Sequence, residues 1–202
     1  MIIRSVDFTG SVPRPGQALP GDLPQIAFSG RSNVGKSSLI NVLLRRTRKK
    51  VARVSSTPGK TQNLNFFRVN DRFYLVDLPG YGYARAPGDV REAWRRLVED
   101  YFSRGEELRG VVHLVDGRHT PTKLDLEMMG YLEALALPAL VILTKMDKVS
   151  RSRREKTLKV AVEALGVARE QVLPFSAKTG EGRDALLTAL DELLTESPGD
   201  EP

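Results

Sequence analysis

The sequence predicts a three-layer α/β domain with a mostly parallel, six-stranded sheet in which one strand runs antiparallel. Apolar strand-like runs alternate with amphipathic helical segments along the chain, the pattern of helices covering both faces of a sheet. The runs 111–116 and 139–144 are apolar throughout, as expected for parallel strands buried on both faces. Asn70-Asp71 is a hairpin turn signal between two further runs, so one strand of that hairpin must be antiparallel.

The other elements follow from periodicity and from the residues that begin or end them. Thr120-Pro121 resembles a helix N-cap followed by proline at the first helical position, and Gly166 marks a helix end. Strands are expected over 24–29, 64–69, 72–78 and 171–177. Helices are expected over 37–44 and around the apolar positions Val90, Trp94, Leu97, Val98, Tyr101 and Phe102, then Leu158, Ala161, Val162 and Leu165, then Leu186, Leu187, Leu190, Leu193 and Leu194.

Composition excludes several classes of protein. The chain has 202 residues, of which 41% are hydrophobic and 28% charged, so global disorder is not expected. It has no cysteine, which excludes disulfides, cysteine-ligated zinc and cysteine catalysis. No apolar run approaches the roughly 18 residues of a membrane helix, and no secretory signal is visible. We therefore expect a cytoplasmic protein without a membrane partner, and nothing indicates a dimer interface, so a monomer is expected.

Three segments are expected along the chain. Residues 1–23 contain a short strand and a loop rich in proline and glycine, which should pack on the main domain. The main domain is expected at 24–195, and 196–202 should form a flexible tail.

A phosphate-binding loop is predicted between the strand at 24–29 and the helix at 37–44. The segment GRSNVGKS fits G-x-x-x-x-G-K-[ST], whose glycines let backbone amides surround phosphate oxygens. Lys36 would reach the β- and γ-phosphates, and Ser37 would offer its hydroxyl to Mg²⁺. The nucleotide-binding residues expected here are Gly30, Arg31, Ser32, Asn33, Val34, Gly35, Lys36, Ser37 and Ser38.

Two further segments predict a guanine pocket at the same edge of the sheet, because ligands bind at the carboxyl ends of parallel strands. In TKMD, Asp147 would accept hydrogen bonds from N1–H and the 2-amino group of guanine, which adenine does not offer as a pair. The stem of Lys145 would lie across the base, and the Ala177 amide in FSAK would donate to O6. Thr144, Phe175 and Ser176 complete the expected pocket.

A loop that senses the γ-phosphate is predicted at DLPG, comprising Asp77, Leu78, Pro79 and Gly80. Asp77 would hold Mg²⁺ through water, and the Gly80 amide would contact the γ-phosphate, so phosphate loss would release the loop that follows. A polar, basic stretch at 45–62 is expected to close over the nucleotide. Thr57 and Thr61 in that stretch are both candidates for a second Mg²⁺ ligand.

GRSNVGKSSLIN, TPGKTQ, DLPGYGYA, DGRHTP, TKMDK and FSAKTG occur in this order over residues 30–180. Together they resemble the EngB (YihA/YsxC) family of bacterial ribosome-assembly GTPases. The resemblance implies a P-loop NTPase of the Ras-like, TRAFAC-class G-domain type that binds GTP and GDP and acts in assembly of the large (50S) ribosomal subunit, in contact with its rRNA. It also assigns the Mg²⁺ role to Thr61 over Thr57, with Gly59 and Lys60 beside the nucleotide, and makes Thr144 no departure from the family.

Slow hydrolysis is expected. The residue after Gly80, where Ras-type enzymes carry a water-orienting glutamine, is Tyr81, so the rate should be on the order of 10⁻³ s⁻¹ or below. Lys36, Thr61 and Gly80 are the expected catalytic groups. Asn33 resembles the asparagine of GTPases that bind K⁺ beside the phosphates, so K⁺ is a further candidate cofactor; a hydrogen bond within its own loop is the alternative role.

Charge predicts an anionic partner. The formal net charge is +6, and two basic runs are expected to contact RNA phosphates: Arg45, Arg46, Arg48, Lys49 and Lys50, and Arg151, Arg153, Arg154 and Lys156. Two other functions stay open at this point. One is a small-molecule kinase with a phosphate loop, which TKMD and FSAK disfavour, and the other is a membrane-linked or cell-division GTPase, for which no anchor is visible.

Overall fold

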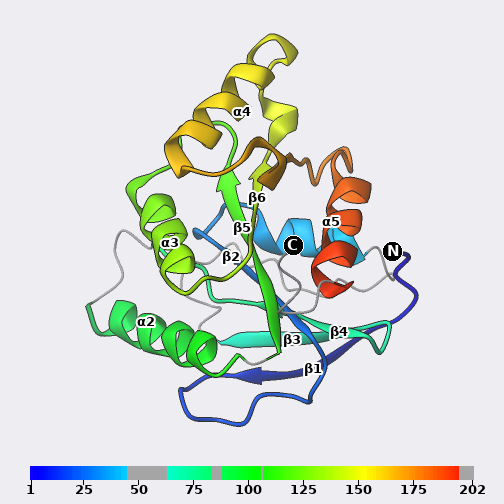
Figure 1. The fold of residues 1–202 in the computed structure, drawn as a ribbon, viewed down its shortest axis with the longest axis vertical. Coiled ribbons are helices and arrows are strands. Elements are labelled where there is room, and N and C mark those ends of the chain that lie inside the picture. Colours follow the sequence, from blue (N-terminus) through cyan, green and yellow to red (C-terminus); the bar gives the residue numbers. More distant parts are fainter. Residues whose placement is uncertain (45–62, 83–87, 106, 196–202) are drawn as a thin grey trace.

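The protein is described by a computed structural model in which residues 1–44, 63–82, 88–105 and 107–195 are described. They form a seven-stranded sheet with the spatial order β1-β3-β4-β2-β5-β6-β7. Figure 1 labels the strands from β1 to β6. The strands are β1 (Val6–Val12), β2 (Gln25–Gly30), β3 (Leu64–Val69), β4 (Phe73–Asp77), β5 (Leu108–Asp116), β6 (Ala139–Thr144) and β7 (Val172–Pro174). The helices are α1 (Lys36–Leu44), α2 (Gly88–Ser103), α3 (Lys123–Ala134), α4 (Arg151–Leu165) and α5 (Arg183–Thr195), with single 3₁₀ turns at Met146–Lys148 and Arg169–Gln171.

The sheet is parallel except at β3, which runs antiparallel to both β4 and β1. The predicted single antiparallel strand is therefore confirmed, but the sheet has seven strands where six were expected. The seventh is β1, which pairs with β3 from Val6 opposite Val69 to Val12 opposite Leu64. The side chains of this edge strand are mostly exposed or half-buried, so its sequence carries little of the apolar signal of a sheet strand.

The predicted hairpin turn joins β3 to β4 and also holds the N-terminal segment. Asn70 and Asp71 have φ angles of 54° and 51°, the left-handed pair that a type I′ turn needs. The Asn70 side chain accepts hydrogen bonds from the amides of Arg4 (2.6 Å) and Ser5 (3.1 Å) and donates to the carbonyl of Ile2 (2.7 Å). One turn residue thus anchors the chain that leads into β1.

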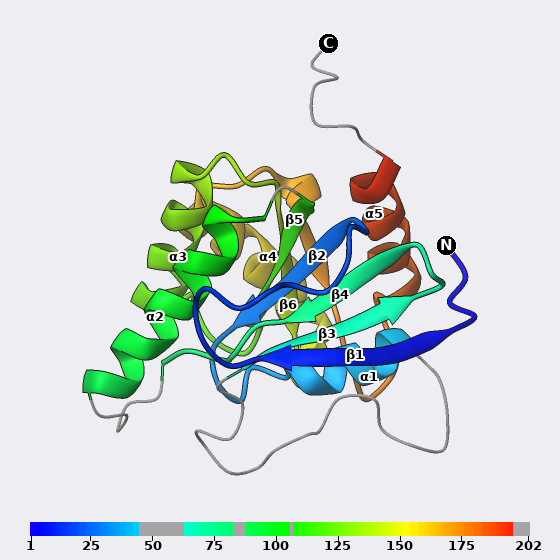
Figure 2. The ribbon, with the colours of Figure 1, turned by 90° about the horizontal axis from the view of Figure 1, so that it is seen from below.

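Helices cover both faces of the sheet, which confirms the predicted three layers. Figure 2 shows α2 and α3 on one side of the sheet and α1 and α5 on the other. One core lies beneath α2, α3 and α4, and the second lies beneath α1 and α5. Among the described residues, no helix is long and apolar enough to cross a membrane.

The largest differences from the predicted boundaries are at β5, α3 and β7. Strand β5 begins at Leu108, three residues before the run predicted at 111–116. Helix α3 is capped by Thr122 rather than Thr120, because the Asp125 carboxylate reaches back to accept from the Thr122 amide (2.8 Å) and hydroxyl (2.7 Å). Strand β7 begins after a 3₁₀ turn that includes Gln171 and stops at Pro174, and residues 175–177 of the run predicted at 171–177 form a loop. The end of α4 is as expected, with Gly166 in the left-handed region at φ 66°.

The division into segments 1–23, 24–195 and 196–202 stays a prediction, and the last of these lies outside the described residues.

Candidate nucleotide site

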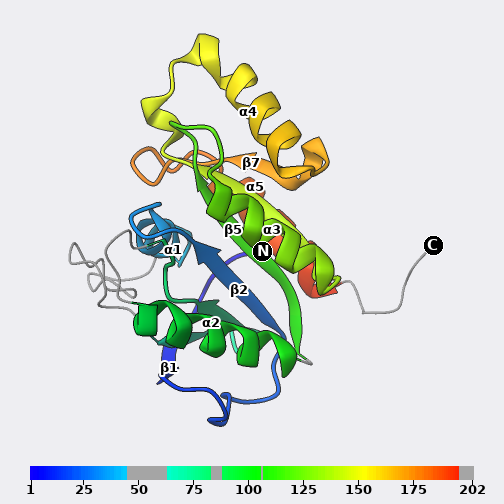
Figure 3. The ribbon, with the colours of Figure 1, turned by 90° about the vertical axis from the view of Figure 1, so that its left-hand side faces the viewer.

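The predicted site segments follow the carboxyl ends of parallel strands and so meet at one edge of the sheet. The phosphate loop follows β2, which runs into α1 (Figure 3). The DLPG loop follows β4, TKMD follows β6 and FSAK follows β7. The segment with Gly59, Lys60 and Thr61 lies outside the described residues, as do Thr57 and the first basic run.

Backbone geometry in the phosphate loop requires glycine. Gly30 has φ 156°, and a Cβ atom there would lie 3.0 Å from both the Leu114 carbonyl oxygen and Val34 Cγ1. Gly35 has φ 110°, a value that side chains rarely allow. Asn33, at φ 64°, is the exposed residue of the loop that adopts the left-handed conformation, which asparagine tolerates better than most residues.

Lys36 begins α1 and lies in contact with the DLPG loop. Its buried ammonium forms an ion pair with Asp77 and donates to the carbonyl oxygen of Leu78 at 2.6 Å. Ser37 and Ser38 follow it and are half-buried. The phosphate-loop cation and the predicted Mg²⁺-binding carboxylate are therefore neighbours.

The DLPG loop packs directly on the phosphate loop. The Ser32 amide donates to the Tyr81 carbonyl oxygen at 2.8 Å, and the Tyr81 amide donates to the Gly30 carbonyl oxygen at 3.4 Å. A Cβ atom at Gly80 would lie 3.1 Å from Ser32 Oγ, so the two loops approach closely at this glycine. Trp94 of α2 donates its indole N–H to the Pro79 carbonyl oxygen at 2.7 Å.

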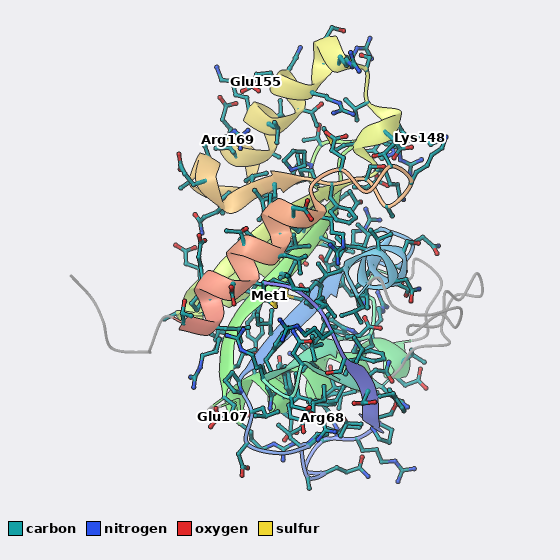
Figure 4. All side chains as sticks on the ribbon, turned by 90° about the vertical axis from the view of Figure 1, so that its right-hand side faces the viewer. Met1, Arg68, Glu107, Lys148, Glu155 and Arg169 are labelled. Atoms are coloured by element: carbon teal, nitrogen blue, oxygen red, sulfur yellow. The ribbon has the colours of Figure 1, made fainter. Side chains whose placement is uncertain are left out.

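The two segments of the predicted base pocket are joined by hydrogen bonds. Ser176 Oγ donates to Asp147 Oδ1 at 2.8 Å, and the Met146 amide donates to the Phe175 carbonyl oxygen at 3.1 Å. Ala177 is the next residue of this loop. Lys148 lies at the surface of the molecule (Figure 4), with its ammonium 4.0 Å from Asp147 Oδ2.

Lys145 and Thr144 link this pocket to the phosphate loop. Lys145, at φ 60°, extends its ammonium to the Asn33 carbonyl oxygen (2.7 Å) and to Asp116 Oδ2 (2.8 Å). The buried Thr144 hydroxyl lies 2.7 Å from the Val34 carbonyl oxygen, to which it donates. The side chain of Lys145 thus spans the space between the base-pocket loop and the phosphate loop.

Comparison with known proteins assigns the fold and the chemistry. A family model described as "50S ribosome-binding GTPase" matches residues 25–145. A probable GTP-binding protein EngB from Citrifermentans bemidjiense is 49% identical over 96% of this chain and 90% of its own length. Another from Geobacter sp. (strain M21) is 47% identical over all of this chain and 94% of its own length.

The chain belongs to the EngB family of GTP-binding proteins. A crystal structure of a probable GTP-binding protein EngB has a TM-score of 0.71 and 27% identity, covering 86% of this chain and all of the other. Era from Aquifex aeolicus, at 23% identity and a TM-score of 0.68, shows the same fold over 89% of this chain and 60% of its own. The chain is a GTPase, and the small-molecule kinase alternative is set aside.

In this EngB-family protein, the structure also shows a residue beside the site whose contacts the sequence does not predict. Asp116, at the end of β5, accepts from Arg118 Nε (2.9 Å) and Nη2 (2.7 Å) as well as from Lys145. Partial burial works to raise the pKa of Asp116, but the hydrogen bonds from Arg118 and Lys145 outweigh it and hold this pKa well below its usual range. Asp116 therefore stays ionised and anchors the Lys145 ammonium.

Arg154 packs against the segments of the predicted base pocket and is not part of the exposed basic surface where it is expected from the sequence. Its guanidinium bonds to Glu181 Oε1 at 2.5 Å and to the Met146 carbonyl oxygen at 3.0 Å. Arg154 therefore ties α4 to the TKMD segment and to the loop that follows FSAK. Arg151, Arg153 and Lys156 remain exposed.

Tyr81 follows the DLPG glycine, and its side chain points into the protein. Its hydroxyl lies 3.1 Å from Asp125 Oδ1 and 3.3 Å from His113 Nε2. Burial, followed by the charge of Asp125, raises the pKa of Tyr81 well above its usual range, so the phenol is neutral. In this GTPase the hydroxyl at the position of the water-orienting glutamine is thus bonded inside the protein.

Acid is expected to destabilise the protein through His113. Burial lowers the pKa of this imidazole to about 4, while Asp125 opposes the shift. The unfolded chain binds a proton there near pH 6.5, so unfolding takes up a proton between pH 6.5 and 4. As the pH falls through that interval, His113 should lower the free energy of unfolding by about 1.4 kcal/mol per pH unit. An NMR titration should find the His113 imidazole neutral at pH 5.5, and a midpoint near 6.5 would contradict this prediction.

Proposed function

We propose that this GTPase is a nucleotide-dependent switch in the assembly of the large (50S) ribosomal subunit. The observation that carries the proposal is the packing of the DLPG loop on the phosphate loop at Gly80 and Ser32. A γ-phosphate held by the phosphate loop would meet the Gly80 amide there, so loss of that phosphate would change the loop. The family model's description, a 50S ribosome-binding GTPase, supports the choice of partner.

In this proposal the phosphates are held by the amides of the phosphate loop and by Lys36, and the base is held by Asp147, Lys145 and the Ala177 amide. Each group is at the shared edge of the sheet, and Lys36 is already buried against Asp77. Guanine selectivity would come from the Asp147 carboxylate, because a base that covers this carboxylate without offering it a donor pair would bind at a cost.

The residues present fit Mg²⁺. Ser37 and Asp77 offer the hard oxygen ligands that this ion prefers, and Thr61 would add a third. Within the described ranges, no three His, Cys, Asp or Glu side chains are grouped as around a metal, which suits an ion that takes few protein ligands together with phosphates and water. Bound Mg²⁺ would neutralise charge that develops on the phosphate oxygens during hydrolysis.

Hydrolysis would be slow, on the order of 10⁻³ s⁻¹ without a partner. Its support is the Tyr81 hydroxyl, which bonds to Asp125 and offers no water-orienting amide. Stimulation by K⁺ at Asn33 stays a proposal, because the left-handed backbone at Asn33 is by itself a reason for asparagine there.

The proposed contact with rRNA would use exposed basic residues near the base pocket. Arg151, Arg153 and Lys156 are exposed in the first turns of α4, on a chain with a net charge of +6. Contacts of this kind with phosphates weaken steeply as salt is raised. We propose that the protein acts there as a monomer in the cytoplasm.

Cosedimentation with 50S, 30S and 70S particles tests this function. The protein would be run with GDP, with a non-hydrolysable GTP analogue and without nucleotide, at two salt concentrations. We expect pelleting with 50S alone, dependent on the analogue and reduced by salt. A variant with Arg151, Arg153 and Lys156 changed to glutamine should pellet less, and Lys159→Gln, on the same helix, serves as its control. Absence of pelleting in every state would remove the ribosomal assignment.

A further inference from the structure

Four buried polar side chains form a continuous hydrogen-bonded chain that the nucleotide site does not use directly. Ser29 Oγ lies 2.8 Å from His113 Nδ1, His113 Nε2 lies 3.3 Å from the Tyr81 hydroxyl, and that hydroxyl lies 3.1 Å from Asp125 Oδ1. All four residues are buried. This series of hydrogen bonds therefore links β2 to β5, then β5 to the residue after the DLPG glycine, and that residue to the first turn of α3.

The direction of each hydrogen bond follows from the carboxylate end. Asp125 is an acceptor, so the Tyr81 hydroxyl donates to it, and His113 Nε2–H must then donate to the Tyr81 oxygen. His113 Nδ1 is left as an acceptor for the Ser29 hydroxyl. Burial keeps the pKa of His113 low, in agreement with this neutral tautomer. Each member thus has a partner, which makes the arrangement specific and costly to break.

The side chain of Tyr81 holds a backbone that reaches the phosphate loop. Its amide and carbonyl groups bond to Gly30 and Ser32, and Gly80 immediately precedes it. On the other side, the ring of Trp94 packs against the ring of Tyr81 with centroids 5.6 Å apart. The position of the Gly80 amide therefore depends on where the Tyr81 side chain is held.

We propose that the hydrogen bonds joining His113, Tyr81 and Asp125 form a latch that holds the Gly80 amide where the γ-phosphate arrives and so favours GTP over GDP. Tyr81 and Asp125 are then positioning residues for the triphosphate. A loop ordered in advance loses less conformational entropy on binding, and only a nucleotide that touches the loop gains from it. The inference rests on the proposed contact between Gly80 and the γ-phosphate.

Two conservative variants remove the hydrogen bond from the Tyr81 hydroxyl to the Asp125 carboxylate. Tyr81→Phe keeps the ring beside Trp94 and removes only the hydroxyl. In Asp125→Asn, the amide carbonyl can still accept from Thr122, but the amino group cannot accept from Tyr81. Both variants keep the capping box of α3, which Asp125 Oδ2 forms with Thr122.

Tyr101→Phe is the matched control for the loss of a buried hydroxyl. Tyr101 lies in α2 and is fully buried, and its hydroxyl donates to the buried Gln25 at 2.9 Å. This hydrogen bond lies away from the phosphate and DLPG loops. A general loss of stability should therefore appear in Tyr101→Phe, without a change in the preference for GTP.

The experiment measures the dissociation constants of GDP and of a non-hydrolysable GTP analogue for the full chain and each variant, with thermal unfolding alongside. Trp94, the only tryptophan, packs on Tyr81 and donates to Pro79, so its emission is an additional readout of the DLPG loop. We expect Tyr81→Phe and Asp125→Asn each to weaken analogue binding about tenfold and GDP binding less than twofold. The double variant should lose no more than either single variant, because one latch is broken in each case.

Equal losses for both nucleotides would overturn the proposal, since the residues would then act only on stability. Unchanged analogue affinity would overturn it too, as would losses that add in the double variant. Tyr101→Phe should leave the ratio of the two affinities unchanged, and a shift as large as that of Tyr81→Phe would also contradict the latch. No ribosomal particle is used, so failure here leaves the cosedimentation result standing, and failure there leaves this result standing.

Discussion

Replacement of Asp147 with asparagine is expected to weaken GTP binding by about a thousandfold and to create affinity for xanthosine triphosphate. Ser176 Oγ donates to Asp147 Oδ1, so an asparagine would keep its carbonyl oxygen toward Ser176. Its amino group would then take the place of Oδ2 and face a guanine donor. Xanthine carries a carbonyl where guanine carries the 2-amino group, which restores a donor–acceptor pair.

Equilibrium binding of GTP, xanthosine triphosphate and ATP checks this prediction. Asp184→Asn is the control, because it removes the same charge from a side chain that is 95% exposed and pairs with Arg183. GTP affinity within about threefold of the parent in Asp147→Asn would contradict the assignment of this carboxylate to the base.

Replacement of Lys36 with methionine is expected to lower the rate of GTP hydrolysis by about 10²–10³-fold. The methionine retains the apolar stem but loses the buried cation that is proposed to bind the phosphates. It also leaves Asp77, itself buried, without its ion-pair partner. Affinity for the GTP analogue should therefore fall as well.

Single-turnover hydrolysis at saturating protein separates the rate from the affinity in this variant. Lys159→Met, with a side chain 76% exposed on α4, is the matched control and should behave as the parent. Hydrolysis by Lys36→Met within a few-fold of the parent rate would show that Lys36 does not act on the phosphates.

The sequence predicts the fold well where its signal is local. The apolar runs of β5 and β6, the Asn70-Asp71 turn and the Gly166 helix end each give their element directly. The sequence predicts a short strand within residues 1–23 but does not place it in the sheet, because the exposed side chains of an edge strand give little apolar signal. The proline after Thr120 favours that residue as the cap of α3, but Asp125 gives Thr122 a reciprocal partner.

The candidate site shows the same division between local and tertiary information. The order of the motifs predicts which loops meet, since parallel strands bring their carboxyl ends together. The latch was not predicted, because His113 and Asp125 approach Tyr81 only after β5 pairs with β2 and α3 packs beside them.

One missed residue did have a signal in the sequence. Arg154 lies four residues before Leu158, on the helical stripe that continues to Ala161 and Leu165. Its position on the inner face of α4 therefore distinguishes it from Arg151 and Arg153, whose charge alone suggested a common role. Its partners, Glu181 and the Met146 carbonyl, could not be named without the fold.

Nucleotide affinity measured with and without 50S particles tests the central claim most directly. If the analogue-bound protein is the state that binds the particle, the particle must by reciprocity tighten analogue binding and leave GDP binding weaker in comparison. We predict that saturating 50S raises the affinity for the analogue at least tenfold over any change for GDP, whereas 30S does not. Equal affinities for both nucleotides in the presence and absence of 50S would contradict the account of this GTPase as an assembly switch.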